Sequence, residues 1–181
     1  IDLQSLMTKG FLNSISCGEE LTLQFGICGR EQGSEMRWFD TGLHGVVFHP
    51  GNAYELNGKI YMDAPVYKNP KALLEDLTTA RNGKTSGGTV ANPFVFEIDL
   101  AAGTVKSTQV SDLGAELPRI DDRLVGYHNR YGYAVIGEPA HGPECASRIG
   151  KYNTFGDSMI FSRHVEGEYV NEPIFVPREL D

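Results

Sequence analysis

Short segments in which apolar and polar residues alternate run along most of this sequence, separated by turns rich in glycine and proline. Such alternation is typical of β-strands with one buried face. The 21 glycines and nine prolines also favour an all-β fold over a helical one. Strands are predicted at residues 21–27, 36–40, 43–49, 59–63, 94–100, 104–110, 130–136, 158–165 and 169–176. Successive antiparallel hairpins of this kind suit a propeller, a sandwich or a barrel.

Two local signals are stronger than the rest. Asn57-Gly58, between two apolar segments, predicts a hairpin with a type I′ turn. Asn69 is a suitable helix cap, and Pro70 suits the first helical position. Three leucines that follow at helical spacing complete the prediction of one short helix: Leu73, Leu74 and Leu77. The first 20 residues carry no clear pattern.

Length, net charge and the distribution of apolar residues limit the classes of function. A length of 181 residues is enough for one domain with a core. The net charge of −8 argues against a surface for nucleic acid or anionic membranes, because both need clustered lysine and arginine. No apolar run is long enough to span a bilayer, and no signal-peptide pattern is present. The missing initiator methionine predicts a trimmed or incomplete chain.

Cysteine usage predicts the compartment. Cys17, Cys28 and Cys145 are odd in number and widely spaced, and they form no C-x-x-C pair. Such a set fits a reducing environment better than a disulfide framework, so the protein is predicted to be cytoplasmic.

The segment from Phe48 to Glu55 is the first candidate for a functional site. His49 ends a short apolar strand and is followed by a turn and a carboxylate, an arrangement that suits a metal ligand. His44 lies five residues earlier, which in a regular strand places it on the opposite face. The two histidines are therefore not expected to bind one metal unless a bulge intervenes.

Two other features of the sequence point to different classes of protein. Gly83-Lys84-Thr85 resembles the end of a phosphate-binding loop, but the glycine required five residues earlier is replaced by Thr78, so the motif is rejected. An iron-dependent cupin fits the chain length, although its usual H-x-H pair is absent. That alternative stays open, and it predicts a closed barrel with several metal-binding histidines inside this chain.

Several segments together resemble one family. Residues 48–55 resemble the F-H-x-x-N-A-x-E signature of carotenoid cleavage oxygenases, which include lignostilbene dioxygenases and the retinoid isomerase of the eye. Four further segments fit in the family's order and approximate spacing: residues 37–39, 116–120, 130–134 and 171–178. The resemblance therefore covers residues 36–178.

The resemblance implies a seven-bladed β-propeller with a ferrous ion on its axis, held by four histidines. His49 matches the third iron ligand. Glu116 and Glu172 match two of the outer glutamates that accept hydrogen bonds from the ligating imidazoles. Glu55 belongs to the signature without a ligand role, and no catalytic residue is implied beyond the metal site. The activity implied is cleavage of a conjugated carbon–carbon double bond by O2, in a carotenoid, apocarotenoid or stilbene, to two carbonyl products; isomerase chemistry stays open.

The length of the chain qualifies this implication. At about 45 residues per blade, residues 1–181 make about four blades of a single, incomplete propeller domain, with the helix in a loop insertion. The first two ligand segments would then precede residue 1 and the fourth would follow residue 181, so this chain alone is expected to be inactive. The alternative is a catalytically silent propeller fragment that acts as a binding or structural piece. Peripheral membrane contact of the full enzyme and its oligomeric state stay open.

The remaining histidines lie in no ligand motif of the family. They are His44, His128, His141 and His164. Of these, His128 is interpreted as a turn residue, and His141 and His164 are interpreted as surface residues.

Overall fold

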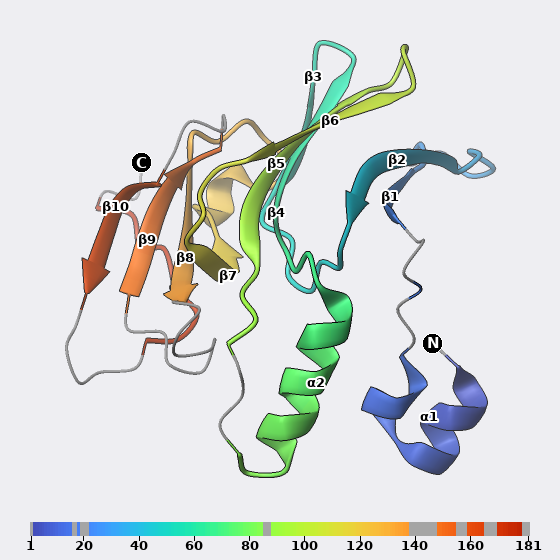
Figure 1. Cartoon of the computed structure of the whole chain (residues 1–181). Coiled ribbons are helices and arrows are strands. Elements are labelled where there is room, and N and C mark those ends of the chain that lie inside the picture. Colours follow the sequence, from blue (N-terminus) through green and yellow to red (C-terminus); the bar gives the residue numbers. More distant parts are fainter. Residues whose placement is uncertain are drawn as a thin grey trace.

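The computed structural model describes residues 2–15, 18, 22–84, 88–137, 148–154, 159–164 and 170–178. The described part is all-β with few helices, as the alternating pattern predicts. Its strands form three antiparallel sheets that stand side by side, with the two α-helices below them (Figure 1). These described strands make open sheets with free edges, whereas the cupin alternative predicts a closed barrel.

The first sheet is a two-stranded ribbon of β1 (Thr22–Ile27) and β2 (Arg37–His44). β2 runs unbroken across a stretch where two strands were predicted, at residues 36–40 and 43–49. Beyond β2 only a single bridge forms, between Val46 and Tyr67 of the neighbouring sheet. His49 therefore lies in a loop, where strand alternation does not apply.

The middle sheet is a meander in the order β3-β4-β5-β6. Its first hairpin turns at Asn57 and Gly58, whose φ angles of 53° and 75° confirm the predicted type I′ turn. At the last turn, Asp99 Oδ1 accepts hydrogen bonds from the backbone N–H groups of two following residues, at 3.0 and 2.8 Å. The strands are β3 (Ala53–Leu56), β4 (Lys59–Val66), β5 (Asn92–Asp99) and β6 (Thr104–Gln109).

The third sheet has the order β10-β9-β8-β7 and differs from the predicted terminal hairpin. β10 pairs with β9, a strand missed because its segment follows a loop rich in glycine and proline. Residues 170–177 belong to no strand, because Pro173 and Pro177 lack the N–H groups that a ladder needs. The strands are β7 (Gly114–Arg119), β8 (Tyr131–Gly137), β9 (Arg148–Asn153) and β10 (Met159–His164).

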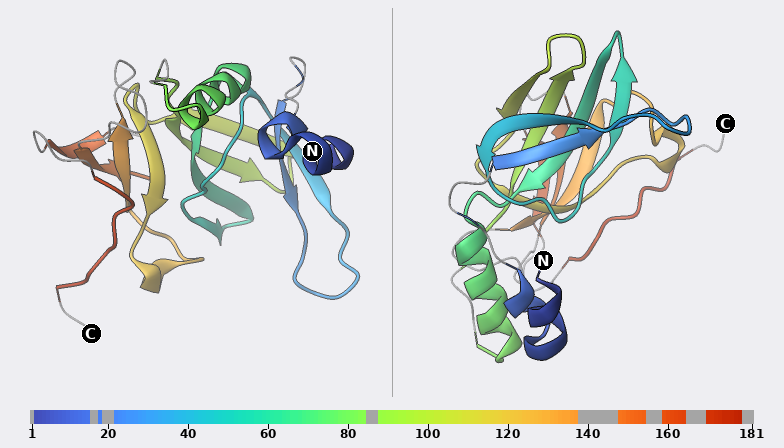
Figure 2. Two further views of the ribbon diagram at one scale, coloured as in Figure 1. Left: turned by 90° about the horizontal axis from the view of Figure 1, so that it is seen from below. Right: turned by 90° about the vertical axis from the view of Figure 1, so that its right-hand side faces the viewer.

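The middle sheet is buried on both faces along β5 and the second half of β4. Phe94 and Phe96 of β5 pack on the ribbon, where Phe96 meets the ring of Phe25 edge-on at 4.9 Å. Val95 faces the other way and joins a cluster with residues of the third sheet such as Ile136. Figure 2 shows the middle sheet between its two neighbours. This alternation along β5 holds the three sheets together.

The two α-helices lie at one end of the sheets (Figure 1). Helix α2 (Pro70–Arg81) confirms the predicted helix: Asn69 Oδ1 accepts from the Ala72 N–H at 3.0 Å, and Leu73 is buried. Helix α1 (Leu3–Lys9) and the 3₁₀ turn η1 (Phe11–Ser14) were not predicted. A second 3₁₀ turn, η2 (Asp122–Leu124), follows β7. Among the described residues, no helix combines the length and the apolar character that crossing a bilayer requires.

We expect Phe96→Ala to lower the free energy of unfolding by about 3–5 kcal/mol, because the fully buried ring leaves a cavity between the ribbon and the middle sheet. Phe11→Ala is the matched control, since Phe11 is 54% exposed and should cost about 0.5 kcal/mol or less. Urea unfolding measures both variants. Equal costs for the two would contradict the packing described for β5.

Candidate metal centre

His49 lies in a loop whose two ends are held by backbone hydrogen bonds beside the middle sheet. On one side, Val46 and Tyr67 exchange two backbone hydrogen bonds, of 3.1 and 3.0 Å. On the other side, the Gly51 N–H donates to the Asp63 carbonyl at 2.8 Å. Between these two points the loop has four residues, 47–50, whereas β4 has only three, 64–66. The loop therefore bulges outward. The side chain of His49 is 54% exposed.

The structure brings His49 together with Glu116, although 67 residues separate them. His49 Nδ1 lies 3.0 Å from Glu116 Oε2. A carboxylate oxygen accepts hydrogen bonds, so this contact favours the tautomer of His49 with its proton on Nδ1. In the neutral ring this leaves the lone pair on Nε2, the nitrogen that points away from the carboxylate. The contact joins the loop of the middle sheet to β7 of the third sheet.

An irregularity in β7 aims Glu116 at the loop. The register of β7 against β8 shifts between Glu116 and Arg119. Within this shift Leu117 has a φ angle of 53°, a left-handed conformation that costs about 1–2 kcal/mol for a residue with a Cβ. The Leu117 N–H donates to Glu116 Oε2 at 2.9 Å, the same oxygen that faces His49. Strain of this kind persists where surrounding contacts hold it and is common at functional sites.

Tyr67 lies behind Glu116. It is 5% exposed, and burial raises the pKa of its hydroxyl, with a further contribution from the charge and hydrogen bonding of Glu116. Tyr67 is therefore a neutral phenol beside the carboxylate. Glu116 Oε1 is buried without a partner of standard hydrogen-bond geometry among the described residues. A small hollow of about 20 Å³, lined by both side chains, has room for a single water molecule.

Asn52 ties the far end of the loop to the segment that follows β7. Its side-chain amide donates to the Tyr127 carbonyl at 2.9 Å and to Asn129 Oδ1 at 2.7 Å. It also donates to the Leu124 carbonyl at 3.3 Å, while Asn52 Oδ1 accepts from the Gly126 N–H at 3.0 Å. One buried side chain thus holds the loop after η2 against the loop that carries His49.

Glu172 is not brought to His49. Its side chain is 49% exposed and forms an ion pair with Arg119, with Nη1 and Oε1 3.5 Å apart. The extended segment around it lies along β8, where Phe175 meets the ring of Tyr133 with centroids 5.6 Å apart. Within the described residues the two predicted glutamates therefore have different partners.

The other histidines lie apart from this contact. His44 ends β2 and is exposed, and the exposed His128 meets the Tyr54 ring edge-on with centroids 5.3 Å apart. His141, the side chain of His164, Cys17 and Cys145 fall outside the described residues. In the part of the chain that the structure describes, no three His, Cys, Asp or Glu side chains are grouped to hold a metal.

The sequence singled out His49 and Glu116 but assigned no role to Tyr67 or Asn52. Asn52 stands inside the F-H-x-x-N-A-x-E pattern, so its place there was a signal that a role existed. Tyr67 gave no such signal, because a tyrosine that ends an apolar strand resembles any core aromatic residue.

Comparison with known proteins identifies the family. The sequence profile of the retinal pigment epithelial membrane protein (RPE65) family matches residues 1–181. The chain therefore belongs to this family of carotenoid oxygenases, which confirms the resemblance drawn from the motifs.

The relatives are oxygenases by name. Isoeugenol monooxygenase of Pseudomonas nitroreducens is 31% identical over 177 residues, which cover 88% of this chain and 35% of that protein. Apocarotenoid-15,15'-oxygenase of Synechocystis is 29% identical over 74% of this chain and 27% of its own length. Lignostilbene-alpha,beta-dioxygenase isozyme III of Sphingomonas paucimobilis is 26% identical over 89% of this chain and 36% of its own length. The chain thus spans about a third of the length of such relatives.

Solved structures of related proteins superpose on this chain. Cobalt-substituted Synechocystis ACO superposes with a TM-score of 0.66 and 28% identity, over 81% of this chain and 30% of that one. A point variant of Synechocystis ACO superposes with a TM-score of 0.74 and 25% identity, over 93% of this chain and 34% of that one.

We expect Asn52→Asp to destabilise the protein by about 1–3 kcal/mol, because the carboxylate keeps the shape of the side chain but loses both N–H donors. The carbonyls of Leu124 and Tyr127 would then face an acceptor. Asn171→Asp is the control on an exposed site: Asn171 Oδ1 accepts from the Glu172 N–H at 2.8 Å, a bond that a carboxylate keeps, so the expected change is within about 0.5 kcal/mol. Denaturant unfolding monitored by circular dichroism gives both values, and a neutral Asn52→Asp would contradict the network.

Proposed function

We propose that this chain is part of a nonheme iron(II) dioxygenase that cleaves a conjugated carbon–carbon double bond to two carbonyl products. The contact between His49 Nδ1 and Glu116 Oε2 carries this proposal. It pairs the residue matched to an iron ligand with a residue matched to an outer glutamate, and the two were named independently from motifs far apart in the sequence.

The proposed role of His49 is to bind Fe(II) through Nε2. The site fits this role as one ligand of several, because Nδ1 is occupied by Glu116 while the ring is half exposed. A carboxylate on the far nitrogen fixes the tautomer and makes the imidazole a stronger donor. The other ligands must come from outside the described residues, which group no further metal-binding side chains around His49. Bound iron would supply the chemistry of O2 at the double bond.

Glu172 is proposed as an outer glutamate for a different histidine. Its ion pair with Arg119 anchors it near β7, the strand that also carries Glu116. Arg119 thereby holds the exposed carboxylate in place.

The proposed fold of the complete enzyme is a seven-bladed propeller. Two four-stranded antiparallel meanders lie side by side here, and such sheets are the units from which propeller blades are built. A histidine in the loop that enters one meander, facing a carboxylate of the next, suits a metal bound where the blades converge.

The substrate class is proposed from the names of the relatives. An apocarotenoid and lignostilbene appear among them, in line with the polyenes and stilbenes expected from the motifs, and isoeugenol adds a smaller candidate. The protein positions such a molecule and excludes water, while the metal carries the oxygen chemistry. Cytoplasmic location remains a prediction from cysteine usage.

A catalytically silent propeller piece is the second candidate. It is favoured by the absence, among the described residues, of any three-residue group that could hold a metal. Iron stoichiometry separates the two proposals, because the enzyme needs one tightly bound iron per complete propeller and the silent piece needs none.

We expect His49→Ala to abolish stoichiometric iron binding in the full-length protein, and Glu116→Gln to weaken iron affinity about 10–100-fold, since it removes an outer carboxylate. His44→Ala is the control and should keep its iron, because His44 is exposed at the end of β2. Elemental analysis with intact mass measures the metal content of each variant. Full iron content in His49→Ala would overturn the ligand role.

A further inference from the structure

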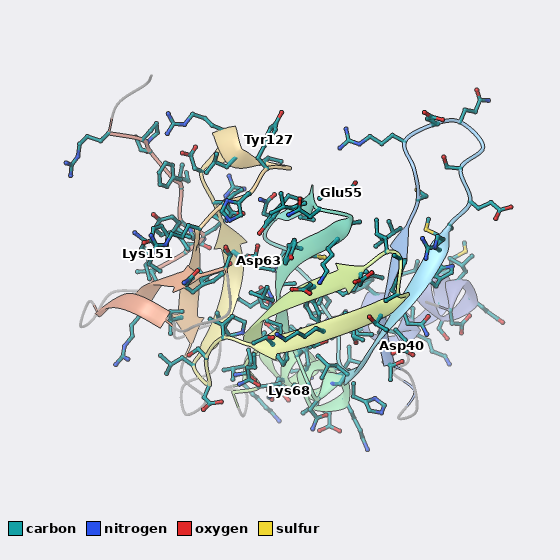
Figure 3. The ribbon with its side chains drawn as sticks, turned by 90° about the horizontal axis from the view of Figure 1, so that it is seen from above. Asp40, Glu55, Asp63, Lys68, Tyr127 and Lys151 are labelled. Carbon is teal, nitrogen blue, oxygen red and sulfur yellow. The ribbon has the colours of Figure 1, made fainter. Side chains whose placement is uncertain are left out.

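A buried carboxylate lies directly behind the loop that carries His49. Asp63, on β4, is 4% exposed, and Figure 3 shows it between the two four-stranded sheets. The Tyr152 hydroxyl of β9 donates to Asp63 Oδ2 at 2.6 Å. The Asn52 N–H donates to Asp63 Oδ1 at 3.1 Å. Burial raises the pKa of the Asp63 carboxyl group, so the fold retains a group that is costly to bury.

The backbone of Asp63 holds the same loop. Its carbonyl accepts from the Gly51 N–H at 2.8 Å, and its N–H donates to the Asn52 carbonyl at 3.1 Å. Together with the side-chain bond to Asn52, three hydrogen bonds fasten the residues that directly follow His49-Pro50. The position of His49 therefore depends on where Asp63 lies.

Two glycines, one in the loop before β3 and one in β8, make room for the Asp63–Tyr152 pair. A Cβ atom at Gly51 would overlap Asp63 Oδ2. A Cβ atom at Gly132 on β8 would overlap the ring and hydroxyl of Tyr152. Both sides of the pair are thus closely fitted, and any larger residue at either glycine would displace it.

The pair crosses between the sheets that must stay in register for His49 to meet Glu116. The loop of His49 is bonded to β4 of the middle sheet, while Glu116 belongs to β7 of the third sheet. Sliding of one sheet past the other would break the 3.0 Å contact between His49 Nδ1 and Glu116 Oε2. The bond from Tyr152 to Asp63 opposes such sliding close to the loop.

We propose that Asp63 and Tyr152 are positioning residues for His49: their hydrogen-bonded bridge holds the imidazole where Nδ1 meets Glu116 and Nε2 is presented to a metal. The consequence for metal binding rests on the proposed function. The geometry of His49 does not rest on the proposed function, and it can be measured in the protein without metal.

The test compares Tyr152→Phe and Asp63→Ala with Tyr131→Phe in the full-length protein. Tyr131 lies in the same sheet, paired with Asn153, and takes no part in the bridge. NMR of ¹⁵N-histidine-labelled, metal-free protein measures how fast the His49 Nδ1 proton exchanges with water. We expect both bridge variants to exchange at least about tenfold faster than Tyr131→Phe, and their Co²⁺ affinity to fall by about tenfold. Exchange as slow as in the control would overturn the proposal, even if the variants were less stable.

Asp63→Asn tests whether the hydrogen bonds or the charge carry the effect. The amide oxygen still accepts from the Asn52 N–H, and the amide NH₂ donates to the Tyr152 oxygen, so the bridge persists without a charge. Slow exchange of the His49 proton is therefore expected to be retained, and fast exchange would contradict a hydrogen-bonded bridge. Should Asp63→Ala not fold, Tyr152→Phe decides, because it removes a single oxygen atom.

The two readouts separate this inference from the proposed function. If His49→Ala keeps its iron, the ligand role fails, but proton exchange still reports whether the bridge positions His49. If exchange is unchanged in the bridge variants while His49→Ala loses its iron, the ligand role stands and the positioning role fails.

Discussion

Burial of β5 on both of its faces is the constraint on which the rest of the structure depends. β5 sends Phe94 and Phe96 toward the ribbon and Val95 toward the third sheet, so neither neighbour can leave without exposing apolar surface. With both neighbours in place, the loop that follows β2 runs beside β7. The meeting of His49 and Glu116 is a consequence of this packing, because each residue belongs to a different sheet.

Polar side chains then refine what apolar packing brings together. Asn52 joins the His49 loop to residues after η2, and Asp63 joins β4 to Tyr152 of β9. These bonds are directional, whereas the hydrophobic effect is not. Apolar burial sets which sheets touch, and the buried polar groups set how far one is shifted along the other. A metal ligand needs the second kind of control, since its donor nitrogen must point at one place.

The irregular parts of the backbone lie at the same place. Leu117 takes a left-handed conformation beside Glu116, and the loop of residues 47–50 bulges from the sheet before the ladder resumes. Regular strands would have pointed His49 and Glu116 by simple alternation. The bulge and the register shift instead aim each side chain independently of its strand. Strand parity therefore does not relate His49 to His44, because His49 lies in the loop and not in β2.

By itself the sequence determined the local elements and the family. The Asn57-Gly58 turn, the helix after Asn69 and most strands follow from turn chemistry and periodicity, which act over a few residues. The motifs named His49 and Glu116 but could not say that they touch. Only the tertiary structure decided that contact, the separate partner of Glu172, the pairing of β9 and the burial of Asp63. The reason is distance along the chain: partners 67 and 89 residues apart meet because whole sheets pack, and no local pattern records which faces will meet.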